Sequence, residues 1–134
     1  MRRRAEEAHV ARMATVHPRG WAHLVPIVFV LEGGVLYTSV DAKPKRTPEL
    51  RRIRNIRSNP QVTVLLDHYD EAWEELWWVR LRGPARILEE GEERARAVAL
   101  LREKYPQYRD MPPQGAVIAV DVEEWRGWAW RSLQ

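Results

Sequence analysis

Short runs of apolar residues, separated by turns that contain glycine, proline or asparagine, dominate the pattern of hydrophobic and polar positions along the chain. Runs of this length, rich in valine, isoleucine, leucine and aromatic residues, predict β-strands rather than helices. Tight turns such as Glu32-Gly33-Gly34 favour antiparallel pairing of the flanking runs. The pattern predicts six strands, at residues 13–16, 21–31, 35–40, 61–67, 76–88 and 115–131.

Two of the predicted strands differ in which faces are apolar. Residues 21–31 are apolar on both faces, which predicts a strand buried on both sides, as in a closed barrel. Within this strand Pro26 has no N–H to donate, so it predicts a bulge or a break in the ladder. Residues 76–88 alternate between small or apolar residues and mostly arginine. That alternation predicts one buried and one solvated face.

Helical spacing appears between these strands. Three helices are predicted, at residues 3–12, 47–57 and 89–104. In the second of them Thr47 is the expected N-cap and Pro48 the first helical residue. The inward stripe of that helix consists of Leu50, Ile53 and Ile56. The whole pattern predicts one α+β domain over residues 1–134, built around a six-stranded antiparallel barrel with inserted helices.

Composition narrows the class of protein. A chain of 134 residues without cysteine has no disulfides, thiolate metal sites or cysteine nucleophiles. No apolar run approaches the ~20 residues that a membrane span needs. The charged N-terminus, beginning Met1-Arg2-Arg3-Arg4, has no apolar signal core behind it. We therefore expect a cytoplasmic protein with no membrane partner.

The most charged stretch is residues 43–57, which contains seven Lys or Arg and one Glu in a chain of net charge +3. Three interpretations are open: a solvated helix face, a nucleic-acid-binding surface, or a clamp for a phosphorylated cofactor. Lys43, Lys45 and Arg46 precede the predicted helix, where the helix dipole already favours an anion. Cations placed there favour a bound anion. The compactness of the charge favours a small ligand over nucleic acid, and arginine suits phosphate through bidentate hydrogen bonds.

Motifs for catalysis by the protein's own side chains are scarce. The sequence has no phosphate-binding glycine motif and no zinc-protease motif. Its histidines, His9, His17, His23 and His68, lack the spacing of metal ligands on one helix. We predict no metal site and assign no catalytic residue. If the protein is an enzyme, a bound cofactor carries the chemistry and the protein supplies binding and electrostatics.

Four blocks of sequence resemble a known family. They are Ala14-Thr15-Val16 through His23-Leu24-Val25-Pro26-Ile27-Val28-Phe29, then Leu36-Tyr37-Thr38-Ser39-Val40-Asp41, then Arg54-Asn55-Ile56 with Asn59-Pro60-Gln61-Val62-Thr63-Val64-Leu65, and Trp78-Val79-Arg80-Leu81-Arg82-Gly83-Pro84-Ala85. In order and spacing these blocks resemble the pyridoxamine-phosphate-oxidase-like, FMN-binding split β-barrel superfamily. More closely, they resemble its branch of probable oxidoreductases that depend on the deazaflavin coenzyme F420.

The resemblance implies a homodimer with cofactor sites at the subunit interface. It places the deazaflavin or flavin ring against the second strand, at His23, Val25, Pro26 and Ile27. It places the phosphate at the end of the third strand and in the basic segment. The phosphate residues it implies are Ser39, Lys43, Lys45, Arg46, Arg52 and Asn55, and it brings Trp77 or Trp78 in from the partner subunit.

The function implied by the resemblance is transfer of hydride between coenzyme F420 and a small organic substrate. The alternatives left open are an FMN-dependent oxidoreductase, a non-catalytic module that binds flavin or haem, and an arginine-rich nucleic-acid binder. Pyridoxamine-phosphate oxidases proper are longer and have a C-terminal substrate-binding segment, so we do not expect vitamin B6 oxidation. The sequence does not identify the substrate.

Overall fold

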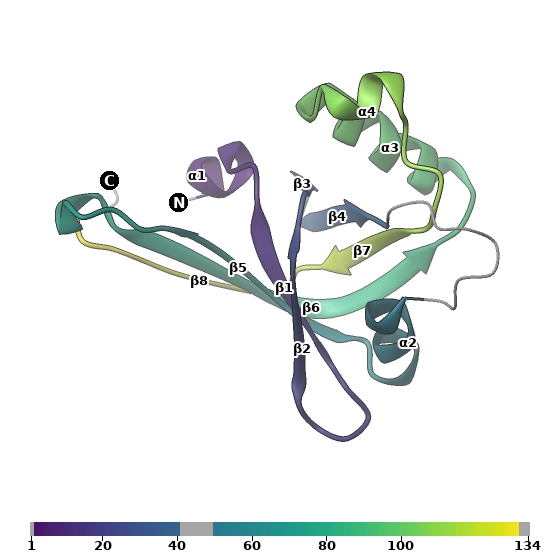
Figure 1. The fold of residues 1–134 in the computed structure, drawn as a ribbon, viewed down its shortest axis with the longest axis horizontal. Helices are drawn as coiled ribbons and strands as arrows, with labels where there is room; N and C mark the ends of the chain where they lie inside the picture. The colour runs from purple at the N-terminus through teal and green to yellow at the C-terminus, as the bar shows by residue number, and fades with distance from the viewer. Residues whose placement is uncertain (1, 41–49, 132–134) are drawn as a thin grey trace.

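The computed structural model describes residues 2–40 and 50–131 (Figure 1). The strands are β1 (Ala11–Val16), β2 (Ala22–Ile27), β3 (Val30–Glu32), β4 (Val35–Ser39), β5 (Gln61–His68), β6 (Trp77–Leu88), β7 (Val117–Asp121) and β8 (Glu124–Ala129). The helices are α1 (Arg2–Glu7), α2 (Arg51–Ser58), α3 (Glu92–Lys104) and α4 (Gln107–Asp110), with a 3₁₀ turn at Trp73–Glu75. The α+β class predicted from the sequence is confirmed.

All strand pairs in the described sheet are antiparallel, in the order β2-β1-β5-β6-β7-β4-β3, and β8 pairs with β6. The sheet does not close on itself, as in a split barrel. The described residues form eight strands rather than the predicted six, because two predicted strands are each divided. Residues 21–31 form β2 and β3, and residues 115–131 contain β7 and β8. Strand β6 is long enough to pair with β5 and β8 along one part and with β7 along another.

The division between β2 and β3 does not occur at Pro26. The ladder continues through Pro26, which pairs with Arg12 of β1, and β2 ends at Ile27. The break falls at Val28 and Phe29, where the Phe29 N–H donates to the Tyr105 hydroxyl at 3.0 Å. The Tyr105 hydroxyl in turn lies 3.0 Å from the Phe29 carbonyl. A tyrosine far along the chain therefore satisfies the backbone groups that the sheet leaves unpaired.

The prediction that the second strand is buried on both faces is wrong for this chain. β2 stands at one end of the described strand order and pairs only with β1. Its outward residues, including Leu24 and Pro26, are exposed, and Leu24 is 65% accessible. Only the inward face contributes to the core, and Ile27 is buried there. Apolar residues on both faces of a strand predict that both faces are covered, and in the single chain only the inward face of β2 is covered.

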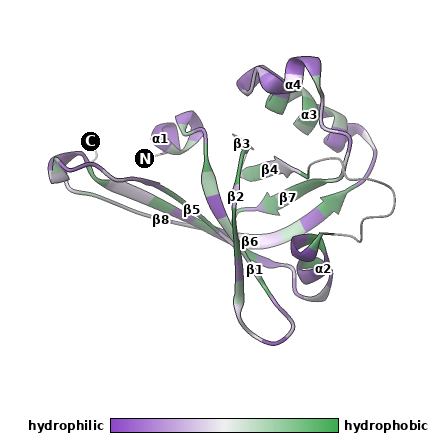
Figure 2. Cartoon of the chain, viewed as in Figure 1, coloured by the Kyte–Doolittle hydropathy of each residue, from purple (hydrophilic) through white to green (hydrophobic). Residues whose placement is uncertain are grey.

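The interior consists of two apolar clusters. The larger lies between the strands and α2 and includes Met13, Val64 and Leu81. The smaller lies between α3 and strands β3, β4 and β7, and includes Leu101 and Val117. Figure 2 shows strand β7 as mainly apolar and helix α1 as mainly hydrophilic, in accord with their positions.

Helix α2 uses the predicted apolar stripe. Ile53 and Ile56 are buried, and Leu50 packs against the same core. The helix begins at Arg51, after Leu50 as N-cap. The predicted N-cap Thr47 and first residue Pro48 lie outside the described residues. The other two helices are shorter than predicted: α1 ends at Glu7, and α3 begins after Gly91, whose φ of 99° favours glycine.

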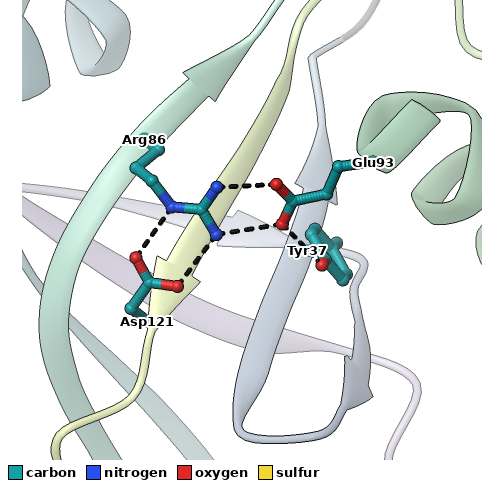
Figure 3. A network of polar contacts seen from close by, with 4 residues as sticks. All are labelled: Tyr37, Arg86, Glu93 and Asp121. Carbon is teal, nitrogen blue, oxygen red and sulfur yellow. Dashed lines mark hydrogen bonds and ion pairs between the residues drawn. The ribbon is translucent and has the colours of Figure 1, made fainter. Parts of the chain in front are cut away.

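A polar network fixes α3 to the sheet (Figure 3). Arg86 of β6 donates to both carboxylate oxygens of Glu93 on α3, at 2.7 and 2.9 Å, and to both of Asp121 on β7, at 2.7 and 2.8 Å. Tyr37 of β4 donates to Glu93 at 2.8 Å. These contacts lower the pKa of Glu93 to about 2, mainly through the Arg86 hydrogen bonds. One arginine therefore joins a helix to two adjacent strands.

In the described part of the chain, no helix has the length and apolar character needed to cross a membrane.

Candidate functional site

A cavity of about 250 Å³ gathers four of the residues predicted from the sequence. They are Pro26 and Ile27 at the end of β2, Ser39 at the end of β4, and Arg52 in the first turn of α2. The remaining lining residues are Val10, Val28, Thr38 and Tyr108. The cavity thus has an apolar wall from β2 and a polar side formed by hydroxyl groups and one arginine.

The fold brings these elements together from distant parts of the sequence. The C-terminal end of β2, the C-terminal end of β4 and the first turn of α2 all border the cavity. Ile53 and Ile56 anchor α2 in the core, so the position of Arg52 is set by packing on the other side of the helix. The cavity therefore lies where two strands end beside the start of a helix, which is where unpaired backbone groups and charged side chains meet a ligand most easily.

Hydroxyl groups give the cavity its hydrogen-bonding capacity. The Ser39 and Tyr108 hydroxyls are 2.8 Å apart. Thr38 is only 1% exposed, and its Oγ1 has no hydrogen-bond partner among the described residues. A buried hydroxyl without a partner costs free energy. A ligand oxygen in the cavity would supply the partner that Thr38 lacks.

Positive charge surrounds the same end of α2. The pKa of His17, in the turn after β1, is lowered by desolvation and then by the positive charges of Arg51 and Arg19, with smaller contributions from His23 and Arg54. His17 also stacks on the ring of Trp21, with centroids 4.2 Å apart. The positive charges that add to the desolvation, those of Arg51, Arg19 and Arg54, would favour an anion at this end of α2.

The structure does not place His23, Val25 and Asn55 among the residues lining this cavity. Val25 packs against the core. Asn55 is fully buried and donates from Nδ2 to the Thr15 hydroxyl at 3.0 Å. His23 is opposite Thr15 across the β1–β2 pair. These residues support α2 and the sheet beneath the cavity, and in this arrangement they do not line it.

Trp77 and Trp78 lie on β6, in a part of the sheet that extends away from α2 with β5 and β8 (Figure 1). Trp77 is partly buried against the core. Trp78 lines a separate cavity of about 290 Å³ with Leu65, Asp67 and Arg80. Neither tryptophan reaches the cavity of its own chain, so their approach from a partner subunit stays a prediction. The predicted phosphate residues Lys43, Lys45 and Arg46 lie outside the described residues.

Sequence reasoning missed two tyrosines that shape the site. Tyr108 lines the cavity from α4, and Tyr105 pins Phe29 beside it. Both lie in a segment predicted to be a loop. The available signal was the spacing of three residues between Tyr105 and Tyr108, just after the apolar stripe of α3. Two residues three positions apart can face the same neighbour across a helical turn.

A second and larger cavity, of about 590 Å³, adjoins the first. Ser39 and Tyr108 line both cavities. The far wall of the larger one is formed by residues 107–114, including Met111, Pro112 and Pro113. The two hydroxyl groups therefore stand between a polar cavity and a more apolar one.

Among the described residues, no group of three or more His, Asp or Glu side chains is arranged to hold a metal ion.

Comparison with known proteins identifies the family. The family model for pyridoxamine 5'-phosphate oxidase matches residues 1–129, so the chain belongs to this family. The match covers all the elements that form the cavity. A search of the curated proteins finds no match.

Solved structures share the fold at low sequence identity. A conserved hypothetical protein from Mycobacterium tuberculosis has a TM-score of 0.77 at 24% identity, over 95% of this chain and 81% of that one. A putative 5-nitroimidazole antibiotic resistance protein from Bacteroides thetaiotaomicron has a TM-score of 0.74 at 19% identity, over 92% and 78%. The haem storage protein HutZ from Vibrio cholerae has a TM-score of 0.71 at 16% identity, over 90% and 85%. At these identities the likeness establishes the split-barrel fold.

Proposed function

We propose that this protein is an oxidoreductase that binds coenzyme F420, or alternatively FMN, at a site that includes the cavity of about 250 Å³ between β2, β4 and α2. The observation that carries the proposal is the meeting of Arg52, Ser39 and the unpartnered Thr38 hydroxyl with the apolar wall at Pro26 and Ile27. Membership in the pyridoxamine 5'-phosphate oxidase family supports a flavin-type cofactor.

The residues present fit such a cofactor. Arg52 would pair with the phosphate through charge-assisted hydrogen bonds, and the Thr38 hydroxyl would donate a hydrogen bond to one of its oxygens. Pro26, Ile27 and Val28 provide apolar contact suited to a planar ring. Because β2 pairs only with β1 in the described sheet, its outer edge has backbone groups for the polar rim of that ring. When bound, the cofactor supplies a carbon or nitrogen centre that donates or accepts hydride.

The protein's own task in this proposal is binding and exclusion of water. Arg51 and Arg54 lie beside Arg52 on α2, and their positive charges favour an anionic cofactor over a neutral one. We assign no protein side chain as the acid or base for the substrate. The substrate is a small organic molecule, because the larger cavity beside Ser39 and Tyr108 holds about 590 Å³ and ligand pockets of ~300–1,000 Å³ take molecules of that size.

We further propose that two copies of the chain assemble. One outward face of the sheet, across β2, β1, β5, β6 and β8, is mostly exposed. The directly opposed residues on this face are Pro26, Arg12, Leu65, Arg80 and Arg126. The next positions on this face include Leu24, Trp78 and Trp128, and Trp128 is 42% exposed. Large apolar side chains on one sheet face are typical of a protein interface. A second copy there would bring Trp78 toward the neighbouring cofactor site.

Titration of the purified protein with F420 and with FMN, followed by ligand fluorescence, tests the proposal. We expect submicromolar binding of F420, weaker binding of FMN, and one cofactor for each chain of a dimer measured by light scattering. Arg52→Ala should weaken binding about 10- to 150-fold, the equivalent of a lost charge-assisted hydrogen bond of about 1.5–3 kcal/mol. Arg3→Ala is the matched control, since Arg3 is an exposed arginine of α1 whose loss should leave binding unchanged.

Two results would count against the proposal. Binding of neither cofactor, together with salt-sensitive binding of RNA or DNA, would favour a nucleic-acid-binding protein. Binding of hemin in preference to both cofactors would favour the haem-binding alternative.

A further inference from the structure

The larger cavity has a wall that α3 holds in place. Arg102 of α3 donates to the carbonyls of Tyr108 and Arg109, at 3.1 and 2.8 Å. Arg94 of the same helix donates to the carbonyls of Pro113 and Gly115, at 3.3 and 2.8 Å. These bonds fix residues 107–114 at both ends. Because α3 is itself tied to the sheet through Glu93, the cavity is a preformed feature of the fold.

The lining of this cavity indicates the chemistry of its ligand. Val40, Met111, Pro112 and Pro113 give an apolar surface. Met111 is 79% exposed and lines the cavity, so its flexible apolar side chain lies where a ligand can cover it. No arginine or lysine lines this cavity among the described residues, and its polar lining includes Asp110 and the amides Gln107 and Gln114. The Asp110 carboxylate disfavours an anion, and the apolar part of the lining suits an uncharged organic molecule.

Counting protons at the boundary identifies one free donor. Ser39 and Tyr108 carry one hydroxyl proton each, and their mutual hydrogen bond of 2.8 Å uses one of them, whichever group donates. Among the described residues no acceptor takes the other proton. One O–H thus remains at the boundary between the two cavities, beside the apolar wall.

We propose that the cavity formed by the end of β4 and residues 107–114 binds an uncharged, mainly apolar organic substrate that has a carbonyl or similar oxygen acceptor, and that the Ser39–Tyr108 hydroxyl pair donates a hydrogen bond to that oxygen. This inference rests on the proposed function for its relation to the cofactor, because the shared hydroxyl pair would position the substrate oxygen beside the first cavity. Tyr108 is in this account a positioning residue, and Met111 helps to determine the size of the substrate.

The test is a titration with 2-cyclohexen-1-one, an uncharged ring with one carbonyl oxygen, followed by ¹H–¹⁵N NMR of the protein with and without saturating cofactor. We expect saturable shifts in the backbone amides of residues 107–111 and 114. Tyr108→Phe should weaken the affinity for this compound about 3- to 10-fold, the effect of one neutral hydrogen bond. Met111→Trp should weaken or abolish the shifts by filling the mouth of the cavity.

Tyr69→Phe is the control, because Tyr69 is 66% exposed and lines neither cavity. Its affinity for the enone should equal that of the unaltered protein. Shifts that map outside residues 107–114 while the cofactor binds normally would overturn the inference and leave the proposed function standing. Enone shifts at residues 107–114 in a protein that binds neither cofactor would sink the proposed function and retain this site. Equal enone affinity in Tyr108→Phe would refute the role of the hydroxyl pair.

Discussion

Replacing Arg86 with methionine tests whether one arginine fixes α3 to the sheet. The change keeps an unbranched side chain close in length to the aliphatic part of arginine and removes four hydrogen bonds, two to Glu93 and two to Asp121. A charge-assisted hydrogen bond contributes about 1.5–3 kcal/mol when protected from water, whereas exposed ion pairs contribute about 0–1 kcal/mol. The Arg86 side chain is 41% exposed, so water replaces part of what is lost. We expect a loss of about 2–3 kcal/mol in the free energy of unfolding.

For a chain of 134 residues, an unfolding entropy of ~2.1 cal/mol/K per residue converts this loss into a Tm decrease of about 7–11 °C. Urea unfolding followed by tryptophan fluorescence measures the free energy directly, at one fixed protein concentration because association would shift the midpoint. Arg82→Met is the matched control. Arg82 lies on the same strand and forms a single ion pair of 3.6 Å with Glu124, so its loss should cost less than about 1 kcal/mol.

The pH dependence provides a second measurement. Glu93 has a pKa lowered from 4.5 to about 2, chiefly by Arg86. A carboxylate with a depressed folded-state pKa stabilises the fold fully above its unfolded value, and this contribution disappears as the pH falls through the folded value. The difference in stability between the unaltered protein and Arg86→Met should therefore be largest above pH 5 and shrink toward pH 2. A difference below about 1 kcal/mol at pH 7, or one that does not change with pH, would refute this account.

Two further perturbations have expected outcomes. In Gly83→Ala, the added Cβ overlaps the backbone carbonyl of Asp121, so soluble yield should collapse or Tm should fall by more than 10 °C. In the control Gly34→Ala, the added Cβ meets open space at a φ of 81°, and the free energy of unfolding should fall by only about 1–2 kcal/mol. Equal effects of the two changes would contradict the close approach at Gly83. Lys104 has a pKa lowered to about 8, mainly by burial, so the folded state loses its proton before the unfolded state does and stability should rise between about pH 8 and pH 10.5. The Lys104 ammonium group lies 3.9 Å from the centroid of the Phe29 ring. Lys104→Met should abolish the rise in stability measured by urea titrations at each pH. An unchanged pH profile would show that the ammonium group is not buried over Phe29.

The features that follow from local pattern were predictable from the sequence. The alternation in residues 76–88 predicts the buried face of β6, where Val79 and Leu81 are inaccessible, and the stripe of Ile53 and Ile56 predicts the inner face of α2. These predictions hold because side-chain period and backbone geometry are set by near neighbours in the chain. Local pattern did not select Pro26, Ile27, Ser39 and Arg52; the family resemblance implied them, and the structure brings these four together around one cavity.

The features that sequence reasoning missed depend on contacts between distant segments. The break between β2 and β3 is held by Tyr105, 76 positions after Phe29, and no pattern within residues 21–31 contains that information. The family resemblance implies that Asn55 contacts the phosphate, and the structure shows that its Nδ2 donates to the Thr15 hydroxyl of β1. Its contact with a phosphate stays a prediction. The apolar stripe of α2 is short, so the sequence pattern does not show whether a polar residue beside it faces the core or the solvent. The second face of β2 is apolar in the sequence yet exposed in the single chain, and local pattern does not show which partner, if any, covers such a face.

The proline in β2 has a consequence for how the protein can aggregate. A strand at the end of a sheet is a template on which a foreign strand can add by backbone hydrogen bonds. The β1–β2 ladder continues past Pro26, and a proline fits such a ladder where its nitrogen points to the outer edge. A strand that attempted to extend the sheet there would meet no donor at that position. The proline therefore removes one donor from this edge and disfavours growth of the sheet by addition of a foreign strand.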